Sequence, residues 1–291
     1  MLRKIFIGVS VLAGFLILAA SGFYAKAYFS TKARMNKQYE VALEGLNVTS
    51  DSAQLAYGAR LIKAKGCVDC HGDDLGGKIF IDDPKLGFII ARNITKGKGG
   101  LPQDYNVSDW ELALKHGIRR DGKPLLIMPS HEYAMLTKED MSAIVAYAMT
   151  VPHVERELPM SEVGPLGNVL TELGKLPLLP AEMIDHSRKL EEEIKAEASI
   201  GYGKYLSNSC IGCHRTNFKG GEPIAPGFPV VADISSTGHV ANWSEDQFIN
   251  TLRTGKTPEG KELKASEMPW NMTAQYTDTE LKALYMFLRS I

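Results

Sequence analysis

The chain has 291 residues, enough for two domains of ordinary size, and 44% of them are hydrophobic, as in a globular protein. Its formal net charge is −1. Residues 1–37 contain six basic residues and no acid, so the remainder holds 27 basic against 34 acidic residues, a balance of −7. This mildly acidic bulk argues against a nucleic-acid-binding protein.

An uncharged apolar run extends from Ile5 to Tyr24 and follows Arg3 and Lys4. As a helix, such a run spans about 30 Å, the thickness of a bilayer's hydrocarbon core. We therefore predict a membrane anchor in residues 1–37, with the basic start in the cytoplasm. The alternative is a cleaved signal peptide, because residues 25–27 (Ala-Lys-Ala) resemble a cleavage site. The length of the run favours a retained anchor.

Two C-x-x-C-H runs, residues 67–71 and 210–214, use all four cysteines of the chain. This spacing is the attachment signature of c-type haem, because two thiols on a tight turn can form thioethers with one haem while the histidine binds its iron. A redox dithiol, a zinc site or a disulfide framework are the alternatives. None of them explains a histidine after both pairs, so we predict two covalently attached haem c groups.

The sequence repeats itself around these motifs. Tyr57-Gly58 precedes the first motif as Tyr202-Gly203 precedes the second, and a Met-Pro pair follows each motif histidine, 57 residues later in the first half and 54 in the second. Such self-similarity indicates duplication of one unit. We therefore expect four parts along the chain: the anchor with its flanks, two haem domains, and a Pro-rich connector between the domains. Their boundaries are 1–37, 38–150, 151–198 and 199–291.

Helices are expected to dominate both units. Apolar residues at helical spacing predict helices over 53–66, 107–116, 138–150, 244–254 and 278–290. Their expected N-caps are Ser108, Thr137, Ser244 and either Thr277 or Asp278. Residues 72–105 and 219–238 are rich in Gly and Pro and are expected to be irregular loops. Residues 181–198, at the end of the connector, are expected to form a charged helix.

The residues that could bind the far side of each iron are Met128 and Met268. Each precedes a proline and occupies the same place in its repeat, whereas a methionine in a loop is ordinarily core filler. His131 is the alternative ligand for the first haem. The remaining histidines lack partners at ligand spacing and are expected at the surface: His116, His153, His186 and His239. A His/Met ligand pair raises the reduction potential of haem iron relative to a His/His pair, and it suits electron relay better than oxygen binding.

Several runs in the first unit resemble a bacterial dihaem cytochrome c family, which includes the cytochrome subunits of membrane-bound alcohol and gluconate dehydrogenases. The runs are residues 57–60 (Tyr-Gly-Ala-Arg), 93–95 (Asn-Ile-Thr), 117–122 (Gly-Ile-Arg-Arg-Asp-Gly), 128–130 (Met-Pro-Ser) and 136–137 (Leu-Thr). The resemblance covers about residues 53–291. It implies an all-α fold of two tandem class I cytochrome c domains after the N-terminal transmembrane helix. It places haem attachment at Cys67, Cys70, Cys210 and Cys213, and iron ligation at His71, Met128, His214 and Met268.

The expected function is that of a membrane-tethered electron carrier without catalytic residues of its own. It would be a single-pass protein of the bacterial inner membrane with its haem domains in the periplasm. Electrons would come from a quinol-oxidising complex or a dehydrogenase and leave to a terminal oxidase or a soluble cytochrome. Dehydrogenase subunits commonly hold three haems, so two motifs favour a stand-alone carrier or a respiratory-complex component. The alternative is a dihaem enzyme, a peroxidase or a thiosulfate dehydrogenase, which would need an open haem face or a further Cys ligand.

Overall fold

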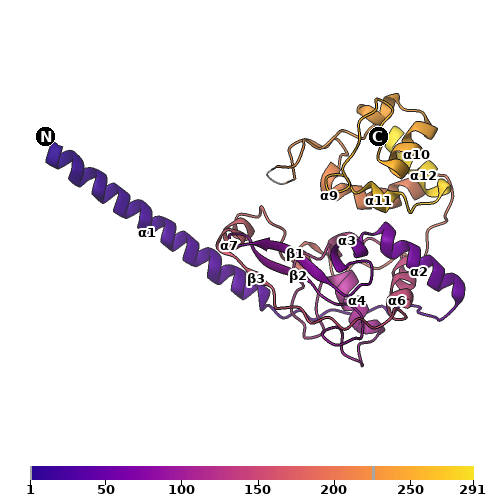
Figure 1. Cartoon of the computed structure of the whole chain (residues 1–291), viewed down its shortest axis with the longest axis horizontal. Coiled ribbons are helices and arrows are strands. Elements are labelled where there is room, and N and C mark those ends of the chain that lie inside the picture. Colours follow the sequence, from indigo (N-terminus) through magenta and orange to yellow (C-terminus); the bar gives the residue numbers. More distant parts are fainter. Residues whose placement is uncertain (1, 225–226) are drawn as a thin grey trace. The chain divides into compact units, whose positions relative to one another are not determined.

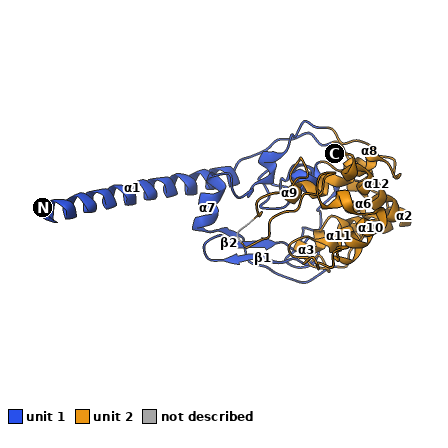
Figure 2. Ribbon diagram, turned by 90° about the horizontal axis from the view of Figure 1, so that it is seen from above, with its two compact units in different colours: residues 1–43, 76–134, 153–188 blue, residues 44–75, 135–152, 189–291 orange. Residues whose placement is uncertain are grey.

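The computed structural model describes residues 2–224 and 227–291 (Figure 1). The chain forms two compact units (Figure 2): unit 1 comprises Met1–Leu43, Gly76–Ala134 and His153–Arg188, and unit 2 comprises Glu44–Leu75, Met135–Pro152 and Lys189–Ile291. Unit 2 thus contains the first C-x-x-C-H motif together with the whole second repeat. The domain boundaries predicted from the sequence repeat (1–37, 38–150, 151–198 and 199–291) remain a prediction.

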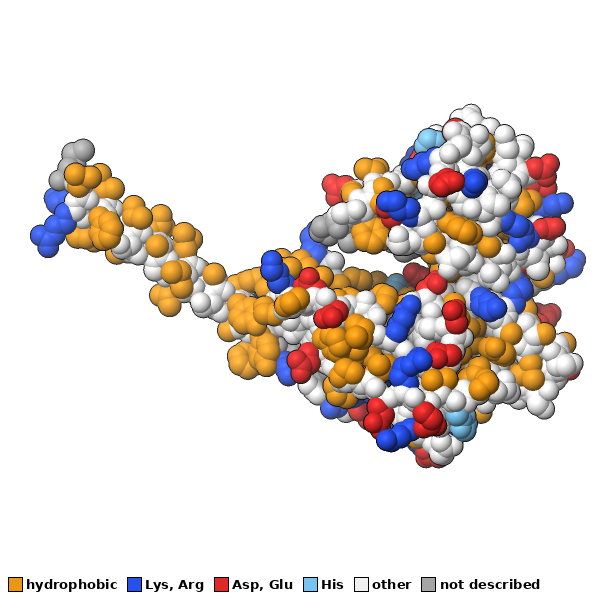
Figure 3. Space-filling model, viewed as in Figure 1, with side chains coloured by type: hydrophobic (Ala, Val, Ile, Leu, Met, Phe, Trp, Pro, Cys, Tyr) orange, Lys and Arg blue, Asp and Glu red, His pale blue; other side chains and the backbone are white. Residues whose placement is uncertain are grey.

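Unit 1 begins with α1, Leu2–Met35, which is long and apolar enough to cross a membrane. Apolar side chains are exposed along its N-terminal half (Figure 3), from Leu2 to Leu18. The helix continues beyond the apolar run because its C-terminal part packs against α7, Pro165–Glu172. There Ala27 and Thr31 are fully buried.

A small antiparallel sheet occupies part of the segment expected to be an irregular loop, so that expectation was wrong for residues 78–91. Strands β1, Lys78–Asp83, and β2, Gly87–Ala91, form a hairpin, and β3, Glu162–Val163, adds a third strand in the order β1-β2-β3. The turn is closed by Asp83, whose Oδ1 accepts from the backbone N–H groups of Lys85 and Leu86. Ile and Phe residues on both strands favour this pairing.

The helices of unit 1 that concern the site are α4, Val107–His116, and α5, Ser130–Tyr133. The predicted helix over 107–116 is confirmed, but its N-cap is Asn106 rather than Ser108. Asn106 and Asp109 form a reciprocal capping box, which satisfies more backbone donors than Ser108 could from within the first turn.

The predicted charged helix over 181–198 is wrong. Only a single 3₁₀ turn, Pro180–Met183, forms there, and the rest has no regular structure. In unit 2 the backbone carbonyls of Glu191 and Glu192 accept hydrogen bonds from the N–H groups of Lys138 and Glu139. The segment therefore satisfies the first turn of α6, a use of its carbonyls that a helix of its own would prevent.

The regular elements that the structure describes in unit 2 are all helices. The first repeat contributes α2, Ser52–Ala64, α3, Cys67–His71, and α6, Lys138–Ala148. The second contributes α8, Ile200–Leu206, η2, Ser207–Cys210, α9, Ile211–His214, η3, His239–Asn242, α10, Glu245–Thr254, α11, Trp270–Thr273, and α12, Asp278–Arg289. The four helices predicted in this unit are confirmed to within about two residues at each end. Thr137, Ser244 and Thr277 cap them as expected.

The duplicated Tyr-Gly pair marks the same helix crossing in each repeat. A Cβ atom on Gly58 of α2 would lie 1.9 Å from the carbonyl oxygen of Ala143 in α6, and one on Gly203 of α8 would lie 2.0 Å from that of Ala283 in α12. Glycine is required because the backbones touch. The two crossings therefore repeat the same packing of the helix before the motif against the last helix of the repeat.

Candidate functional site

His214 is held in one protonation state by its surroundings. Its Nδ1 lies 2.8 Å from the carbonyl oxygen of Ala232, and because a carbonyl only accepts, Nδ1 carries the proton. Burial lowers the pKa of His214, which favours the neutral ring. A neutral imidazole with its proton on Nδ1 presents a lone pair on Nε2, the state that iron binds. Ala232 was not found from the sequence, because a backbone carbonyl leaves no signature in side-chain pattern.

The turn that follows each motif histidine is the same in both repeats. The residue after His71 is Gly72 and the residue after His214 is Arg215, and both have a positive φ, +80° and +68°. Four residues after each histidine the backbone is left-handed again, at Leu75 and Phe218. A positive φ is energetically costly for a residue with a side chain. Its occurrence at Leu75, Arg215 and Phe218 therefore indicates that local backbone preference alone does not determine this turn.

A second repeated turn stands next to the carbonyl that His214 uses. Asp233 Oδ1 accepts from the backbone N–H and the hydroxyl of Ser235, at 2.8 and 2.7 Å. Asn93 Oδ1 accepts from the same two groups of Thr95, at 2.9 and 2.8 Å. The Asn-Ile-Thr run of the first repeat thus has its equivalent in Asp-Ile-Ser of the second. The turn fixes the backbone that precedes it, which includes the carbonyl of Ala232.

Met128 and Met268 lie in equivalent loops. In both repeats the middle helix ends at a left-handed glycine, a short hairpin follows, and the residue two beyond the methionine donates its backbone N–H to the methionine carbonyl at 2.7 Å. The residues at equivalent positions of the two repeats are Gly117 and Gly255, Arg119 and Thr257, Leu125 and Leu263, and Ser130 and Trp270. The correspondence first read from the Met-Pro pairs therefore extends to the backbone.

Each methionine loop is fastened by different residues. In unit 1 the Ser130 hydroxyl donates to Ala113 O at 2.8 Å, and the Ile127 N–H donates to Leu178 O at 2.8 Å. In unit 2 the Trp270 indole donates to Leu263 O at 3.0 Å, and Met268 packs against the core of the unit. The first loop is thus supported by the connector and the second by an aromatic ring.

The predicted site residues are distributed over both units. Cys210, Cys213, His214 and Met268 lie in unit 2, which also contains Cys67, Cys70 and His71, whereas Met128 lies in unit 1. Their roles in haem attachment and iron ligation remain predictions. The residues themselves fit a covalent haem, because each motif supplies two thiols on one helical turn and no disulfide joins the four cysteines, all of them described residues.

His131 remains the alternative to Met128. It is half-buried, its pKa is lowered by burial, and its Nδ1 has no hydrogen-bond partner among the described residues. Its counterpart in the second repeat is Asn271, and asparagine is not among the residues that commonly bind haem iron. The repeat therefore favours Met128.

One of the histidines expected at the surface is buried. His116 is fully buried at the end of α4, and its Nδ1 lies 3.0 Å from Nδ1 of His186. The expectation of a surface position was wrong for His116, because the connector brings His186 onto α4 from 70 residues away; His186 itself is partly exposed. His153 and His239 are exposed, as expected.

Comparison with known proteins gives a consistent result. The family described as Cytochrome c matches residues 55–152 and 199–291. Three relatives are the cytochrome c subunit of the quinone alcohol dehydrogenase of Gluconacetobacter polyoxogenes, the fructose dehydrogenase cytochrome subunit of Gluconobacter japonicus, and the gluconate 2-dehydrogenase cytochrome c subunit of Pantoea cypripedii. The identities are 26%, 27% and 34%, over 83%, 81% and 34% of this chain and 57%, 52% and 24% of the relative. The chain therefore spans about half the length, or less, of these relatives.

Proposed function

Because the chain belongs to the cytochrome c family, we propose that it is a membrane-tethered dihaem cytochrome that transfers electrons on the periplasmic side of a bacterial inner membrane. The observation that carries the proposal is the repetition, in both halves, of the motif turn and the methionine loop. Two covalently attached haem c groups are the cofactors. When bound, each supplies a one-electron ferric/ferrous couple.

The residues of the chain would hold and tune these groups. Cys67 and Cys70 would attach the first haem and Cys210 and Cys213 the second, with His71 and His214 as the proximal ligands. Met128 and Met268 would fill the opposite positions. The Ala232 carbonyl orients the His214 ring and keeps its Nδ1 proton in place. If both methionines bound iron, neither haem would offer a free coordination position to a substrate, and such a ligand set would suit a relay better than an enzyme.

The anchor is supported by the way α1 joins unit 1. Lys26 pairs with Glu172 at 2.9 Å, and Arg34 Nε donates to Glu182 Oε1 at 2.9 Å. Cleavage after Ala27 would remove the first of these pairs and a fully buried residue. Retention keeps both, so we infer that α1 spans the membrane with Arg3 and Lys4 in the cytoplasm.

The donor that we propose is a membrane-associated dehydrogenase, because the relatives above are named as dehydrogenase cytochrome subunits. This choice departs from the expectation that two haem motifs favour a stand-alone carrier. A quinol-oxidising complex is the other donor class. Electrons would leave to a terminal oxidase or a soluble cytochrome. No relative named above is a peroxidase or a thiosulfate dehydrogenase.

The decisive experiment is an optical redox titration of the purified full-length protein, repeated with carbon monoxide added to the reduced form. We expect two low-spin haems of relatively high potential that do not bind carbon monoxide, because each iron would have a histidine and a methionine as protein ligands. A haem that binds carbon monoxide in the unmodified protein would contradict the relay and would direct assays to peroxide and sulfur substrates.

A further inference from the structure

Two equivalent carboxylates in unit 2 connect the first repeat with the second. Asp140 lies in the first turn of α6 and Glu280 in the first turn of α12, each three residues after a threonine N-cap. Each accepts a hydrogen bond from the tyrosine of its own repeat. Tyr57 Oη lies 2.6 Å from Asp140 Oδ1, and Tyr202 Oη lies 3.3 Å from Glu280 Oε1.

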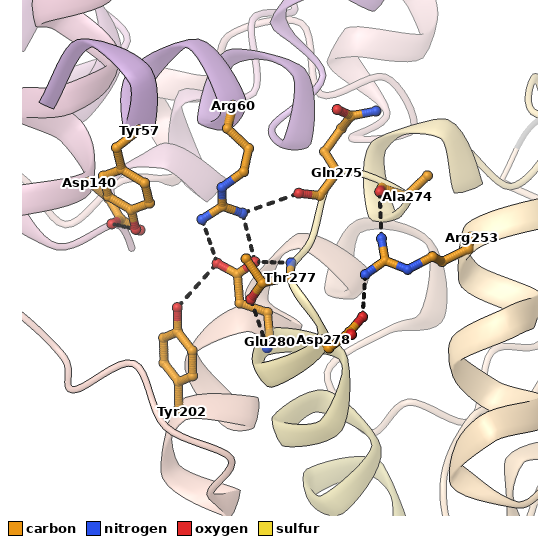
Figure 4. Close-up of polar contacts among 10 residues, drawn as sticks. All are labelled: Tyr57, Arg60, Asp140, Tyr202, Arg253, Ala274, Gln275, Thr277, Asp278 and Glu280. Carbon is orange, nitrogen blue, oxygen red and sulfur yellow. Dashed lines mark hydrogen bonds and ion pairs between the residues drawn. The ribbon is translucent and has the colours of Figure 1, made fainter. Parts of the chain in front are cut away.

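Each carboxylate also takes a partner from the opposite repeat. Arg60 Nη1 and Nη2 donate to Glu280 at 2.7 and 2.9 Å (Figure 4), and Tyr205 Oη donates to Asp140 Oδ2 at 2.5 Å. Arg60 and Tyr205 occupy the same place in their repeats, three residues after the tyrosine of the Tyr-Gly pair. The contact is therefore reciprocal: each repeat offers one donor to the acid of the other.

Burial makes this contact demanding. Asp140 is 5% exposed and Glu280 is 4% exposed, so both carboxylates have given up water and depend on these donors. Loss of Arg60 would leave Glu280 without its cationic partner, and loss of the Tyr205 hydroxyl would remove one of the two tyrosine donors of Asp140, so any other arrangement of the two repeats is penalised. The four side chains therefore specify how α2 and α6 lie against α8 and α12.

The same contact brings the two attachment motifs together. Lys65 stands two residues before Cys67, and its Nζ lies 3.2 Å from the hydroxyl of Ser209, which directly precedes Cys210. Lys65 is 7% exposed, and its ammonium also lies 6.0 Å from the ring centre of Tyr205. A residue next to the first motif thus touches a residue next to the second.

The first motif also contacts the segment that follows Met268. Asp69 lies between the two cysteines of the first motif, and its Oδ1 accepts from Asn271 Nδ2 at 3.1 Å. A Cβ atom on Gly66 would lie 2.9 Å from Cε of Met272, so the Met272 side chain lies directly against the backbone at Gly66. Asn271 and Met272 follow Met268 by three and four residues. The first haem-attachment loop therefore abuts the ligand loop of the second site.

We propose that this contact, between residues 65–70 of the first repeat and residues 209–210 and 271–272 of the second, is the route of electron transfer between the two haems. Four positioning residues keep the two sides of this contact together: Arg60, Tyr205, Asp140 and Glu280. The inference rests on the proposed function, because it needs a haem at each motif. One electron leaves the ferrous iron of one site and reduces the ferric iron of the other, and no bond is made or broken. Tunnelling slows steeply as the gap widens, so residues that fix the gap set the rate.

The test compares Arg60→Leu with Arg253→Leu in the full-length protein. Arg253 is a matched control because it makes its ion pair with Asp278 at 2.7 Å and donates to Ala274 O at 2.8 Å, all within the second repeat (Figure 4). A photochemical one-electron reductant is used to reduce part of the haem, and absorbance follows the redistribution of electrons between the two sites. We expect Arg60→Leu to slow redistribution about tenfold or more and Arg253→Leu to stay within about twofold of the unmodified protein.

Tyr205→Phe provides a milder variant that removes one hydroxyl and keeps the ring. It should slow redistribution in the same direction by a smaller factor, and it decides the question if Arg60→Leu does not fold. All variants should keep low-spin spectra and should not bind carbon monoxide, because the iron ligands are untouched. Rates equal to those of the unmodified protein in both variants would overturn the inference and leave the proposed function standing. Failure of the unmodified protein to show two low-spin haems would overturn the proposed function instead.

Discussion

At the scale of single residues, the two repeats agree at the methionines proposed as iron ligands and differ three residues later. Met128 and Met268 share their local backbone, but His131 has no histidine counterpart, since Asn271 stands in its place. His214, a proposed iron ligand, is oriented by a backbone group, the carbonyl of Ala232. A backbone carbonyl 18 residues away thus fixes which nitrogen of the His214 ring carries the proton.

The ligand assignment predicts a simple pattern of variants. Met128→Ala should open the first haem and Met268→Ala the second, and each variant should bind one carbon monoxide and shift one of the two potentials downward, because a thioether raises the potential. His131→Ala should do neither. Absorbance spectra with carbon monoxide and a redox titration measure both effects. If His131→Ala opened a haem and Met128→Ala did not, the assignment of Met128 would be wrong.

The tyrosines of the carboxylate contact predict a dependence on alkaline pH. Burial, reinforced by the nearby carboxylates, raises the pKa of Tyr57, Tyr202 and Tyr205. An unfolded tyrosine ionises near pH 10, whereas these would still hold their protons in the folded state. Stability should therefore be unaffected below about pH 10 and fall above it, by about 1.4 kcal/mol per pH unit for each such tyrosine.

Tyr57→Phe isolates one of these contributions. Urea unfolding of the variant and the unmodified protein between pH 8 and pH 11 should give free energies of unfolding that converge as the pH rises, because the variant lacks one group that must ionise. Parallel curves would show that Tyr57 does not titrate in the way its burial requires.

At the scale of elements, the two glycine-mediated crossings determine how each repeat is built. The crossing of α8 on α12 leaves no room for a side chain at Gly203, whereas Gly201 in the same helix has no neighbour within 4 Å of a built Cβ. These two glycines serve as a matched pair, because they differ in packing and share a helix.

Gly203→Ala should destabilise the protein by about 2 kcal/mol or more, since the helices must separate to admit the methyl group. Gly201→Ala should stabilise it by up to about 1 kcal/mol, because alanine favours the helix and meets nothing. Equilibrium unfolding in urea, followed by circular dichroism, measures both. Equal effects of the two substitutions would contradict the close crossing.

At the scale of the whole molecule, α1 serves two purposes. Its apolar N-terminal part is exposed and suited to lipid, and its C-terminal part is a structural element of unit 1, packed on α7. The proposed anchor is thus continuous with a helix that packs in the unit that carries Met128.

Two truncations separate these roles. A chain exported behind a cleavable leader and starting at Ala25 should leave the membrane and keep its stability. One starting at Gln38 should also leave the membrane but lose about 1–2 kcal/mol, because it lacks the buried Ala27 and Thr31 and two ion pairs. Membrane fractionation and urea unfolding distinguish the two forms. Equal unfolding midpoints would show that α1 does not support unit 1.

The amino-acid sequence alone predicted much of the architecture. The motif spacing, the duplication and the helices over 107–116, 138–150, 244–254 and 278–290 follow from local patterns, in which residues close in sequence act together. The apolar run from Ile5 to Tyr24 likewise predicted a long helix, because the length and hydropathy of a segment can be determined from its sequence without knowing its contacts.

What only the tertiary structure decided depends on partners distant along the chain. Strand β3 joins the sheet from 71 or more residues away, and the carbonyls of residues 191–192 accept hydrogen bonds from the first turn of α6 instead of forming a helix of their own. Likewise, His116 was buried by the connector, His214 was oriented by Ala232, and Arg60 reached Glu280 across 220 residues. Local sequence determines which elements can form, but only folding brings together the groups that satisfy buried polar atoms.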